Sequence, residues 1–522
     1  MESRPDQTRK ISRRDMIGLL LCLLLGFALR CYTFDQKSLW LDEVYTFEAS
    51  RDALQGQINF YQENPTYLHP PLFFVLTHLF YPFSKPERDL RIIPLIFGTL
   101  SIPMLFFLVK QFSPDIALPC TLSLTFMVYH VSLSQDGRAY SFLLFLGMMS
   151  AFFLMRYLKT ANRAYLPLTA FAFSILFLTS YSSIPFIVFS QILWVYERKE
   201  RSRKKAIASF FILTGCTLVF ILPWLLFVAF NYTGKPLLDP IHMDTPGSLS
   251  KVLYGVLSDW AIYSPLSIVS ALLLALYPIL SKERLKAQAL LALFVLPIIG
   301  LYTFCKLVSV PHFIASRYFI NFLPFFLILL YSSLSSVELR FPAITRRARP
   351  SLLFLIFFIA LNMVTLPFYY SSEKMNFRGL ATYLRKNLQE GDKIFVMTTA
   401  LMPGILHYFE ASPTGRHHRA EPIPGPEKNA GYQIPFYYGG KKFSLIYSST
   451  CCKQFVPDRN RLWLVVFKWK AKQMEGKTPA VLKGFFDGSF LNHDHFPADG
   501  SIYLFLWDPK SPGEKGLDLP IE

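Results

Sequence analysis

Long apolar runs separated by short polar clusters fill the first 370 residues of the chain. Most runs have about twenty residues, the length that an α-helix needs to cross a bilayer. Eleven runs are predicted to span a membrane: 16–32, 92–110, 116–133, 139–156, 164–180, 183–196, 206–230, 263–280, 287–305, 318–335 and 351–369. The pattern therefore predicts a polytopic α-helical membrane protein with about 11–13 spans.

The positions of the basic residues predict which end of each span faces the cytoplasm. One cluster precedes the first span, and further clusters follow every second span. Because cytoplasmic loops carry an excess of Lys and Arg, residues 1–15 are predicted to form a cytoplasmic tail, with every strong cluster on the same side. The first apolar run could be a signal peptide. No small-residue cleavage site follows it and more spans do, so we interpret it as a retained anchor.

Residues 67–83 (YLHPPLFFVLTHLFYPF) form one more apolar segment, which is short and has prolines near both ends. If this segment crossed the membrane, every later basic cluster would fall on the outer side. We therefore predict a juxtamembrane or re-entrant helix on the extracytoplasmic side. An ordinary short span is the alternative.

The composition changes near residue 371, where the long apolar runs end. Residues 375–387 have helical periodicity, and 412–433 are rich in Pro, Gly and charge, which is typical of a loop. Three β-like runs follow the helix: 393–398, 461–467 and 501–507. Residues 371–522 are thus predicted to be a soluble α/β domain, which the span count places outside the cytoplasm, beyond a membrane domain of residues 16–370.

The overall composition agrees with this division. The chain is 52% hydrophobic and only 17% charged, whereas soluble domains are nearer a quarter charged. A net charge of +18 could indicate a nucleic-acid partner, but the positive residues lie in short loops between apolar runs, so none is expected. Of the seven cysteines, most lie in or near spans and are expected to be buried, whereas Cys451 and Cys452 have no explanation. The sequence has no zinc-ligand spacing, P-loop, dinucleotide-binding glycines or nucleophile elbow.

Two adjacent carboxylates, Asp42 and Glu43, lie in the predicted outer loop 33–66, just after the first span. Ionisable groups beside the hydrocarbon are seldom without a use. An isolated pair of this kind would more often cap a helix in a solvated loop. Here Trp40 and Tyr45 flank the pair, and His69 follows on the same side.

Two further polar groups are predicted on that side. Ser134–Tyr140 contains Asp136, which suits a turn, and Arg138, which a turn does not explain. Arg317 precedes a late span, where it could bind an anion or extend to lipid head groups. A guanidinium can hold a phosphate through paired donors. Together these loops predict an acid/base group beside an anion site at the outer membrane surface.

The order of these motifs resembles the GT-C glycosyltransferases, specifically the protein O-mannosyltransferases and aminoarabinose transferases. The resemblance covers roughly residues 10–370. It rests on Asp-Glu at 42–43, His-Pro-Pro-Leu at 69–72, RIIPLIFGTLSIP at 91–103, Gln-Asp-Gly-Arg-Ala-Tyr at 135–140 and Ser-Arg-Tyr at 316–318. It implies a GT-C fold in a membrane protein, with the bacterial inner membrane as the expected location. It also implies a sugar on a polyprenyl phosphate as donor and a protein or glycolipid as acceptor.

The resemblance also implies roles. Asp42 matches the family's catalytic base and Glu43 its companion, while His69, Arg138 and Arg317 match positions near the donor phosphate. Asp136 falls in the second acidic loop, displaced from the family's usual Glu-x-Arg spacing. The implied reaction is a single displacement with inversion. Some GT-C enzymes hold a divalent metal between the two acidic loops, but we expect that no metal or other cofactor is required here.

Two other functions remain as alternatives. A transporter or flippase for lipid-linked sugars would place polar residues near the middle of the bilayer, whereas these lie at the outer ends of the spans. A non-catalytic envelope protein would not need the combination of Asp42, His69, Arg138 and Arg317.

Overall fold

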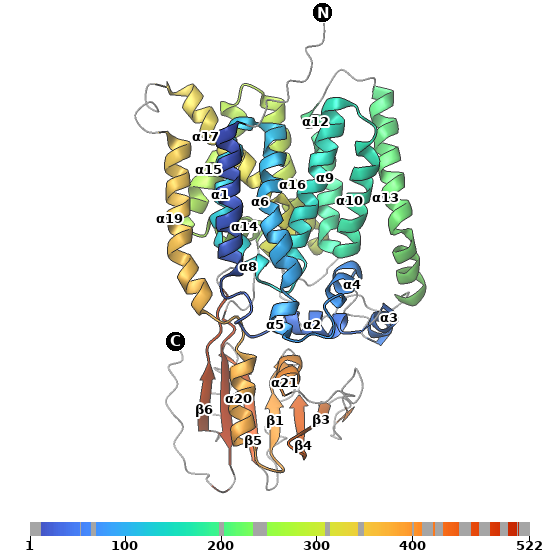
Figure 1. Ribbon diagram of the computed structural model, residues 1–522, viewed down its shortest axis with the longest axis vertical. Helices are drawn as coiled ribbons and strands as arrows, with labels where there is room; N and C mark the ends of the chain where they lie inside the picture. Colours follow the sequence, from blue (N-terminus) through green and yellow to red (C-terminus); the bar gives the residue numbers. More distant parts are fainter. Residues whose placement is uncertain are drawn as a thin grey trace, which may run out of the picture.

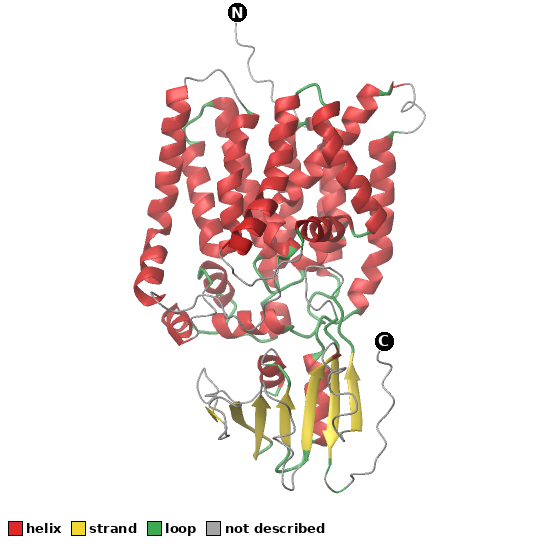
Figure 2. Cartoon of the chain, turned by 180° about the vertical axis from the view of Figure 1, so that it is seen from behind, coloured by secondary structure: helices red, strands yellow, loops and turns green. Residues whose placement is uncertain are grey.

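In the computed structural model of the chain, the described residues are 12–52, 54–63, 69–197, 203–232, 248–307, 314–342, 349–398, 401–409, 421–422, 432–447, 461–468, 481–490, 499–508 and 510. A helical bundle, residues 13–371, lies above a seven-stranded sheet formed within residues 393–507 (Figures 1 and 2). We call the end of the bundle that faces the sheet the sheet end, and the opposite one the far end. The part of the chain from Ser372 onward is called the sheet region.

The bundle contains the following helices: α1 (Arg13–Cys31), α6 (Ile92–Phe112), α7 (Ala117–Phe126), α8 (Val128–Ser134), α9 (Tyr140–Thr160), α10 (Tyr165–Thr179), α11 (Ile184–Phe189), α12 (Leu193–Tyr196), α13 (Arg203–Tyr232), α14 (Leu249–Ala261), α15 (Ser264–Leu280), α16 (Arg284–Leu307), α17 (Leu323–Arg340) and α19 (Pro350–Ser371). Each of the eleven predicted spans coincides with helix. Among the described residues six helices are long and apolar enough to cross a membrane, or up to eight if each bent pair is one span. A polytopic helical membrane protein is therefore confirmed.

Two helix pairs are bent at a short break, and each forms either one broken span or a re-entrant loop. The pair α7 and α8 is bent by 60°, and α14 and α15 by 110°. At the first bend, Arg30 of α1 donates to the carbonyls of Leu124 (3.1 Å) and Thr125 (3.2 Å), while the Val128 N–H donates to Asn362 (2.8 Å). An unsatisfied backbone group away from water costs several kcal/mol, so these contacts stabilise the break. The bend redirects α8, which carries the polar turn 135–139 to the sheet end.

The segment predicted as a loop, 33–66, contains two helices, α2 (Leu41–Ser50) and α3 (Leu54–Glu63). With α4 (Leu72–His78) and α5 (Pro86–Asp89) they lie between the bundle and the sheet (Figure 1). Only seven residues of the predicted juxtamembrane segment form helix α4, which is too short to cross a bilayer. Its place relative to a membrane stays a prediction.

The sheet has the order β2 (Glu421–Pro422), β3 (Tyr432–Tyr438), β4 (Lys441–Tyr447), β1 (Lys393–Val396), β5 (Leu462–Phe467), β7 (Ile502–Trp507), β6 (Val481–Phe486). Central β1 is parallel to β4 and β5, and the other pairs are antiparallel. Gly439 and Gly440 join β3 to β4 with φ of 57° and 76°, which glycine adopts readily in a two-residue hairpin turn.

Helices α20 (Phe377–Asn387) and α21 (Met402–Tyr408) pack on one face of the sheet and bury its alternate side chains, among them Ile394 and Val396. The predicted helix and all three predicted strands are present. The predicted loop 412–433 contains β2 and the start of β3; much of the rest of it lies outside the described residues. A C-terminal β-sheet region is thus confirmed, and its status as a separate extracytoplasmic domain stays a prediction.

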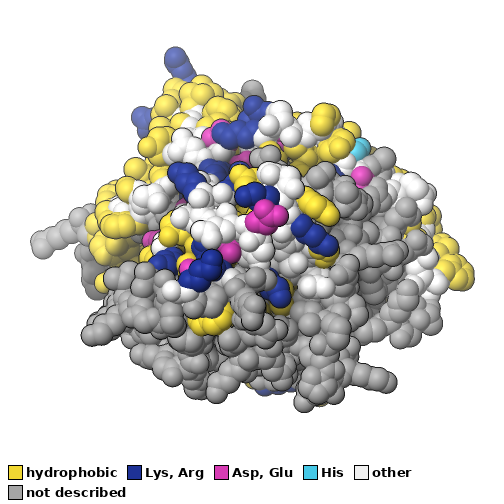
Figure 3. Space-filling model, turned by 90° about the horizontal axis from the view of Figure 1, so that it is seen from below, with side chains coloured by type: hydrophobic (Ala, Val, Ile, Leu, Met, Phe, Trp, Pro, Cys, Tyr) yellow, Lys and Arg dark blue, Asp and Glu magenta, His cyan; other side chains and the backbone are white. Residues whose placement is uncertain are grey.

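The described cysteines agree with the sequence analysis. Cys22, Cys120 and Cys305 are buried and free, whereas Cys451 and Cys452 lie outside the described residues. On the face seen from the sheet end, the described Lys and Arg side chains are interspersed with Asp and Glu (Figure 3).

Candidate active site at the sheet end of the bundle

Helix α2 carries both predicted catalytic carboxylates in its first turn. Acidic side chains are favoured there by the positive end of the helix dipole, and the Trp40 N–H is capped by Glu43 Oε2 at 3.3 Å. The two carboxylates have different surroundings. The side chain of Asp42 is 25% exposed, whereas that of Glu43 is 1% exposed. Asp42 is therefore the accessible carboxylate of the pair.

Glu43 forms a buried ion pair with Arg91, which lies at the start of α6. Arg91 Nε donates to Oε1 at 2.6 Å and Nη2 to Oε2 at 2.7 Å, while the Gly137 N–H also donates to Oε1 at 2.7 Å. Arg91 further donates to three carbonyls in the stretch 34–38. Because both Glu43 oxygens are engaged, this geometry favours a positioning role for Glu43. Its predicted catalytic role stays untested.

Asp136, in the second acidic loop, is also buried and held by two partners. The indole N–H of Trp40 donates to Oδ1 at 2.9 Å, and Lys374 Nζ lies 2.9 Å from Oδ2. Trp40 precedes α2, and Lys374 belongs to the linker between α19 and α20. Asp136 therefore joins the start of α2 and the turn 135–139 to the sheet region.

These contacts bear on whether the two acidic loops could hold a divalent metal. Such a cation needs carboxylate oxygens as ligands, but Glu43 is paired with Arg91, and Asp136 with Lys374 and Trp40. No group of three or more His, Cys, Asp or Glu side chains suited to a metal occurs among the described residues. The residues therefore do not fit a resident metal, and no chemical step is derived through one.

Arg138 lies across the first turn of α2. Its Nη1 donates to Thr46 Oγ1 at 3.2 Å and to the Asp42 carbonyl at 3.4 Å, and its Nε is 3.9 Å from Asp42 Oδ2. The structure therefore brings a predicted phosphate-binding arginine beside the predicted base. The side chain of Arg138 is only 15% exposed, so it is largely enclosed by its neighbours.

Arg317 is buried beside two tyrosines. Its guanidinium carbon is 5.9 Å from the ring centre of Tyr140 and 5.5 Å from that of Tyr318, within the range of a cation–π interaction. Tyr140 follows Arg138 by two residues, and the Arg138 guanidinium lies beside Asp42. Three of the predicted site residues, from three separate segments, thus converge near Tyr140.

A chain of buried hydrogen bonds fixes the residue before Arg317. Ser316 Oγ donates to Asp259 Oδ2 at 2.6 Å and lies 2.9 Å from the Tyr129 hydroxyl. Since the single hydroxyl hydrogen of Ser316 goes to Asp259, Tyr129 is the donor of the second bond. The chain joins α14, the 3₁₀ helix η6 (Ser316–Phe322) and α8, so it holds the Arg317 segment against the helix that leads to Arg138.

His69 lies in the same region, and its ring centre is 6.3 Å from that of Phe74. Burial, aided by the positive charge of Arg138, lowers the pKa of His69 from 6.5 to about 3. A histidine of this kind is neutral near pH 7. If it contacts a donor phosphate as predicted, it does so through an N–H group without a positive charge.

This pKa predicts a pH dependence of stability. Between pH 3 and 6.5 the unfolded chain binds a proton at His69 that the folded chain does not, so stability falls as pH falls through that window. We expect His69→Gln, which does not titrate, to reduce the loss of unfolding free energy between pH 6.5 and 5.5 by about 1 kcal/mol. Denaturation of the wild type and the variant at both pH values measures this difference in unfolding free energy. Equal losses in variant and wild type would contradict the lowered pKa.

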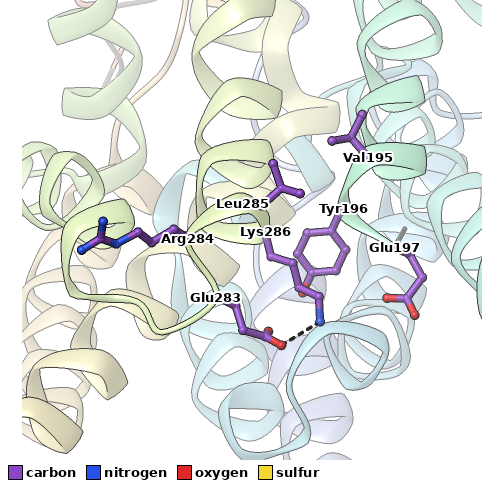
Figure 4. Close-up of a pocket in the computed structure, with 7 residues that line it drawn as sticks. All are labelled: Val195, Tyr196, Glu197, Glu283, Arg284, Leu285 and Lys286. Carbon is purple, nitrogen blue, oxygen red and sulfur yellow. Dashed lines mark hydrogen bonds and ion pairs between the residues drawn. The ribbon is translucent and has the colours of Figure 1, made fainter. Parts of the chain in front are cut away.

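A cavity of about 360 Å³ lies at the far end, lined by Val195, Tyr196, Glu197, Glu283, Arg284, Leu285 and Lys286 (Figure 4). Lys286 donates to Glu283, three residues earlier in the chain, at 3.1 Å. The cavity is lined by both acidic and basic side chains. It lies at the opposite end of the bundle from α2, so it is not part of the candidate site.

The sequence analysis missed several residues that hold the site, chiefly Arg91, Lys374 and Asp259. A signal existed for Arg91, because it is a basic residue on the predicted outer side, against the positive-inside pattern. The sequence also held a signal for Asp259, because an acidic residue next to an apolar run is uncommon. Nothing in the sequence connected Lys374 with Asp136, which lies 238 residues away.

The chain is similar to one family model and to several solved structures. Residues 68–227 match the family model described as dolichyl-phosphate-mannose-protein mannosyltransferase. This region includes His69, Asp136 and Arg138 but neither Asp42 nor Arg317. No curated protein sequence matches the chain.

ArnT from Cupriavidus metallidurans in the apo state aligns with a TM-score of 0.53 and 13% identity over 96% of this chain and 99% of ArnT. ArnT bound to undecaprenyl phosphate aligns over the same shares at 13% identity with a TM-score of 0.49. An oligosaccharyltransferase of Archaeoglobus fulgidus, tethered with an acceptor peptide, has a TM-score of 0.41 and 15% identity over 79% of this chain and 61% of that one. The predicted GT-C fold is confirmed, and residues 68–227 are in addition similar to a family of membrane mannosyltransferases.

Proposed function

We propose that the chain transfers a sugar from a polyprenyl-phosphate donor to an acceptor hydroxyl, or a phosphate oxygen, at the extracytoplasmic face of the membrane. For a hydroxyl acceptor, its oxygen attacks the anomeric carbon and its proton passes to Asp42. The bond between that carbon and the phosphate oxygen breaks, and the polyprenyl phosphate leaves with the electron pair. One displacement inverts the anomeric configuration, and no covalent enzyme intermediate forms.

The observation that carries this proposal is the convergence of Asp42, Arg138 and Arg317. A general base needs an accessible carboxylate within hydrogen-bond reach of its substrate, and only Asp42 among the three predicted acids has an exposed side chain. Negative charge develops on the leaving phosphate, which fixed cationic donors stabilise most when they are already in place. Arg138 and Arg317 lie in packed segments on the same side of the bundle.

The matched family supports the class of donor. Its model is named for dolichyl-phosphate mannose, which is a sugar carried on a polyprenyl phosphate. Such a donor has a lipid tail that must stay in the bilayer while its phosphate reaches the surface. A site at the end of a membrane bundle, with arginines buried beside the apolar core, could bind the phosphate at the surface while the lipid tail stays in the bilayer.

We expect Arg138→Ala and Arg317→Ala each to raise KM for the donor, because each loses a charge-assisted contact with the phosphate. The loss should be about 1.5–3 kcal/mol, or roughly one to two decades in kcat/KM. Transfer from radiolabelled polyprenyl-phosphate sugars to membranes measures it and reveals the acceptor. Arg284→Ala, an exposed arginine at the far end, is the matched control. Wild-type donor saturation in both site variants would overturn the anion site.

The proposed face of the membrane can be tested with single cysteines in a background without the native ones. Lys282 lies in the turn between α15 and α16, and Lys441 begins β4; both are exposed. We expect an impermeant maleimide added to intact cells or spheroplasts to label Lys441→Cys and to spare Lys282→Cys until the membrane is opened. The reverse pattern would invert the topology and put Asp42 in the cytoplasm.

A further inference from the structure

Trp40 belongs structurally to two parts of the molecule. It immediately precedes α2, yet its ring is buried in the apolar core that α20 and α21 form with the sheet. The ring meets Phe490 edge to face at 5.6 Å, and Lys374 Nζ lies 5.0 Å from its centre. The residue that begins the helix of Asp42 is therefore anchored in the sheet region.

The two residues before Trp40 are held by the same region. The Ser38 N–H donates to Glu373 Oε2 at 2.9 Å, and the Leu39 N–H donates to the Tyr408 hydroxyl at 2.7 Å. Tyr408, at the end of α21, donates in turn to Glu87 Oε1 at 2.9 Å. Burial raises the pKa of Tyr408, so the hydroxyl keeps the proton for this bond.

The Tyr408 hydroxyl thus links three segments: α21 of the sheet region, the backbone that enters α2, and α5. Arg378 of α20 reinforces the link through Glu87, which lies 2.7 Å from its Nη2. The segment of Arg317 is held instead by Asp259 and Tyr129 of the bundle. Tyr408 consequently acts on the carboxylate side of the site and not on the Arg317 side.

We propose that Tyr408 is a positioning residue that fixes the start of α2, and with it Asp42, so that the sheet region is a working part of the catalytic site. The inference rests on the proposed function, in which Asp42 is the base. An error of about 1 Å in the place of a catalytic group is enough to slow a reaction strongly. The sheet region would therefore affect the rate of the chemical step more than the binding of donor.

The test compares Tyr408→Phe with Tyr383→Phe in the full-length protein. Tyr383 lies on α20 and packs against Trp463 and Phe486 within the sheet region, so its variant makes the same chemical change away from α2. Because Tyr408→Phe leaves the Leu39 N–H and Glu87 without this partner, we expect it to lower kcat by about tenfold with donor KM unchanged. Tyr383→Phe should match the wild type in both constants.

Hydrogen exchange of the α2 backbone amides, followed by mass spectrometry, gives a second readout that needs no activity. We expect faster exchange across 41–50 in Tyr408→Phe and wild-type exchange in Tyr383→Phe. Equal kcat in the two variants, or an equal effect on exchange, would overturn the positioning role while leaving the proposed function intact. If the wild type transfers sugar from no polyprenyl-phosphate donor, the proposed function fails, and the exchange comparison still decides whether Tyr408 fixes α2.

Discussion

Asp42→Asn is expected to lower kcat by roughly 10²–10⁴, the usual contribution of a positioned general base, with little change in folding stability. Asparagine keeps the shape of the side chain but cannot take the acceptor's proton. The cap of α2 is formed by Trp40 and Glu43, neither of which changes, so α2 should remain intact. Initial rates of sugar transfer, with thermal unfolding of the same preparation, measure both parts of the expectation.

Asp52→Asn is the matched control for this change. Asp52 lies just beyond α2 with a side chain that is 29% exposed, so the same loss of charge occurs nearby without touching the proposed base. Its kcat should stay close to that of the wild type. Nearly full activity of Asp42→Asn would instead mean that Asp42 does not take the acceptor's proton, and the proposed mechanism would lose its base.

Arg91→Met should have the largest effect on stability, because it leaves Glu43 buried without its cationic partner. Breaking a buried ion pair from one side costs about 3–5 kcal/mol, and both side chains are at most 2% exposed. The free energy of unfolding, measured by titration with a denaturing detergent, is expected to fall by that amount. Activity should fall with it, because Glu43 also caps α2 and binds the Gly137 N–H.

The double variant Glu43→Gln with Arg91→Met should recover part of this loss, since no uncompensated charge is left. Arg88→Met is the control: Arg88 pairs with Asp89 at 2.8 Å, but its side chain is 45% exposed, and exposed pairs contribute about 0–1 kcal/mol. A similar stability for Arg91→Met and Arg88→Met would show that the buried pair contributes no more than a surface one.

The sequence predicted the helical bundle well because a span must be long and apolar to satisfy its backbone in lipid. Predicted spans such as 139–156 and 351–369 coincide with α9 and α19. The bends were not predicted, because they depend on partners distant in sequence. Arg30 is 95 residues from Thr125, and Asn362 is 234 residues from Val128. The strands β3 and β4 were missed for a simpler reason, since polar residues and a proline interrupt their alternation.

For the site, the sequence and the family resemblance predicted a set of candidate residues, but not how each side chain is held. Nothing in the adjacent letters of Asp42 and Glu43 distinguishes an accessible carboxylate from one enclosed by Arg91. The helix makes the distinction, because successive residues point about 100° apart. Likewise, Asp136 was placed in the second acidic loop with no partner assigned, and the structure shows it bound to Trp40 and Lys374. Those contacts follow only from the folded arrangement of distant segments.

The contacts around Trp40 also have a consequence for how the protein is made. Ser38 and Leu39 meet partners that lie 335 and 369 residues later in the chain. Ribosomes add about 5–20 residues per second, so the segment before α2 waits on the order of tens of seconds for those partners. A chain that ends after α19 would already contain Asp42 and both arginines, yet it would lack Lys374 and Tyr408. If the proposed function holds, a product truncated there would keep the proposed base and both arginines but lack the contacts that hold the start of α2.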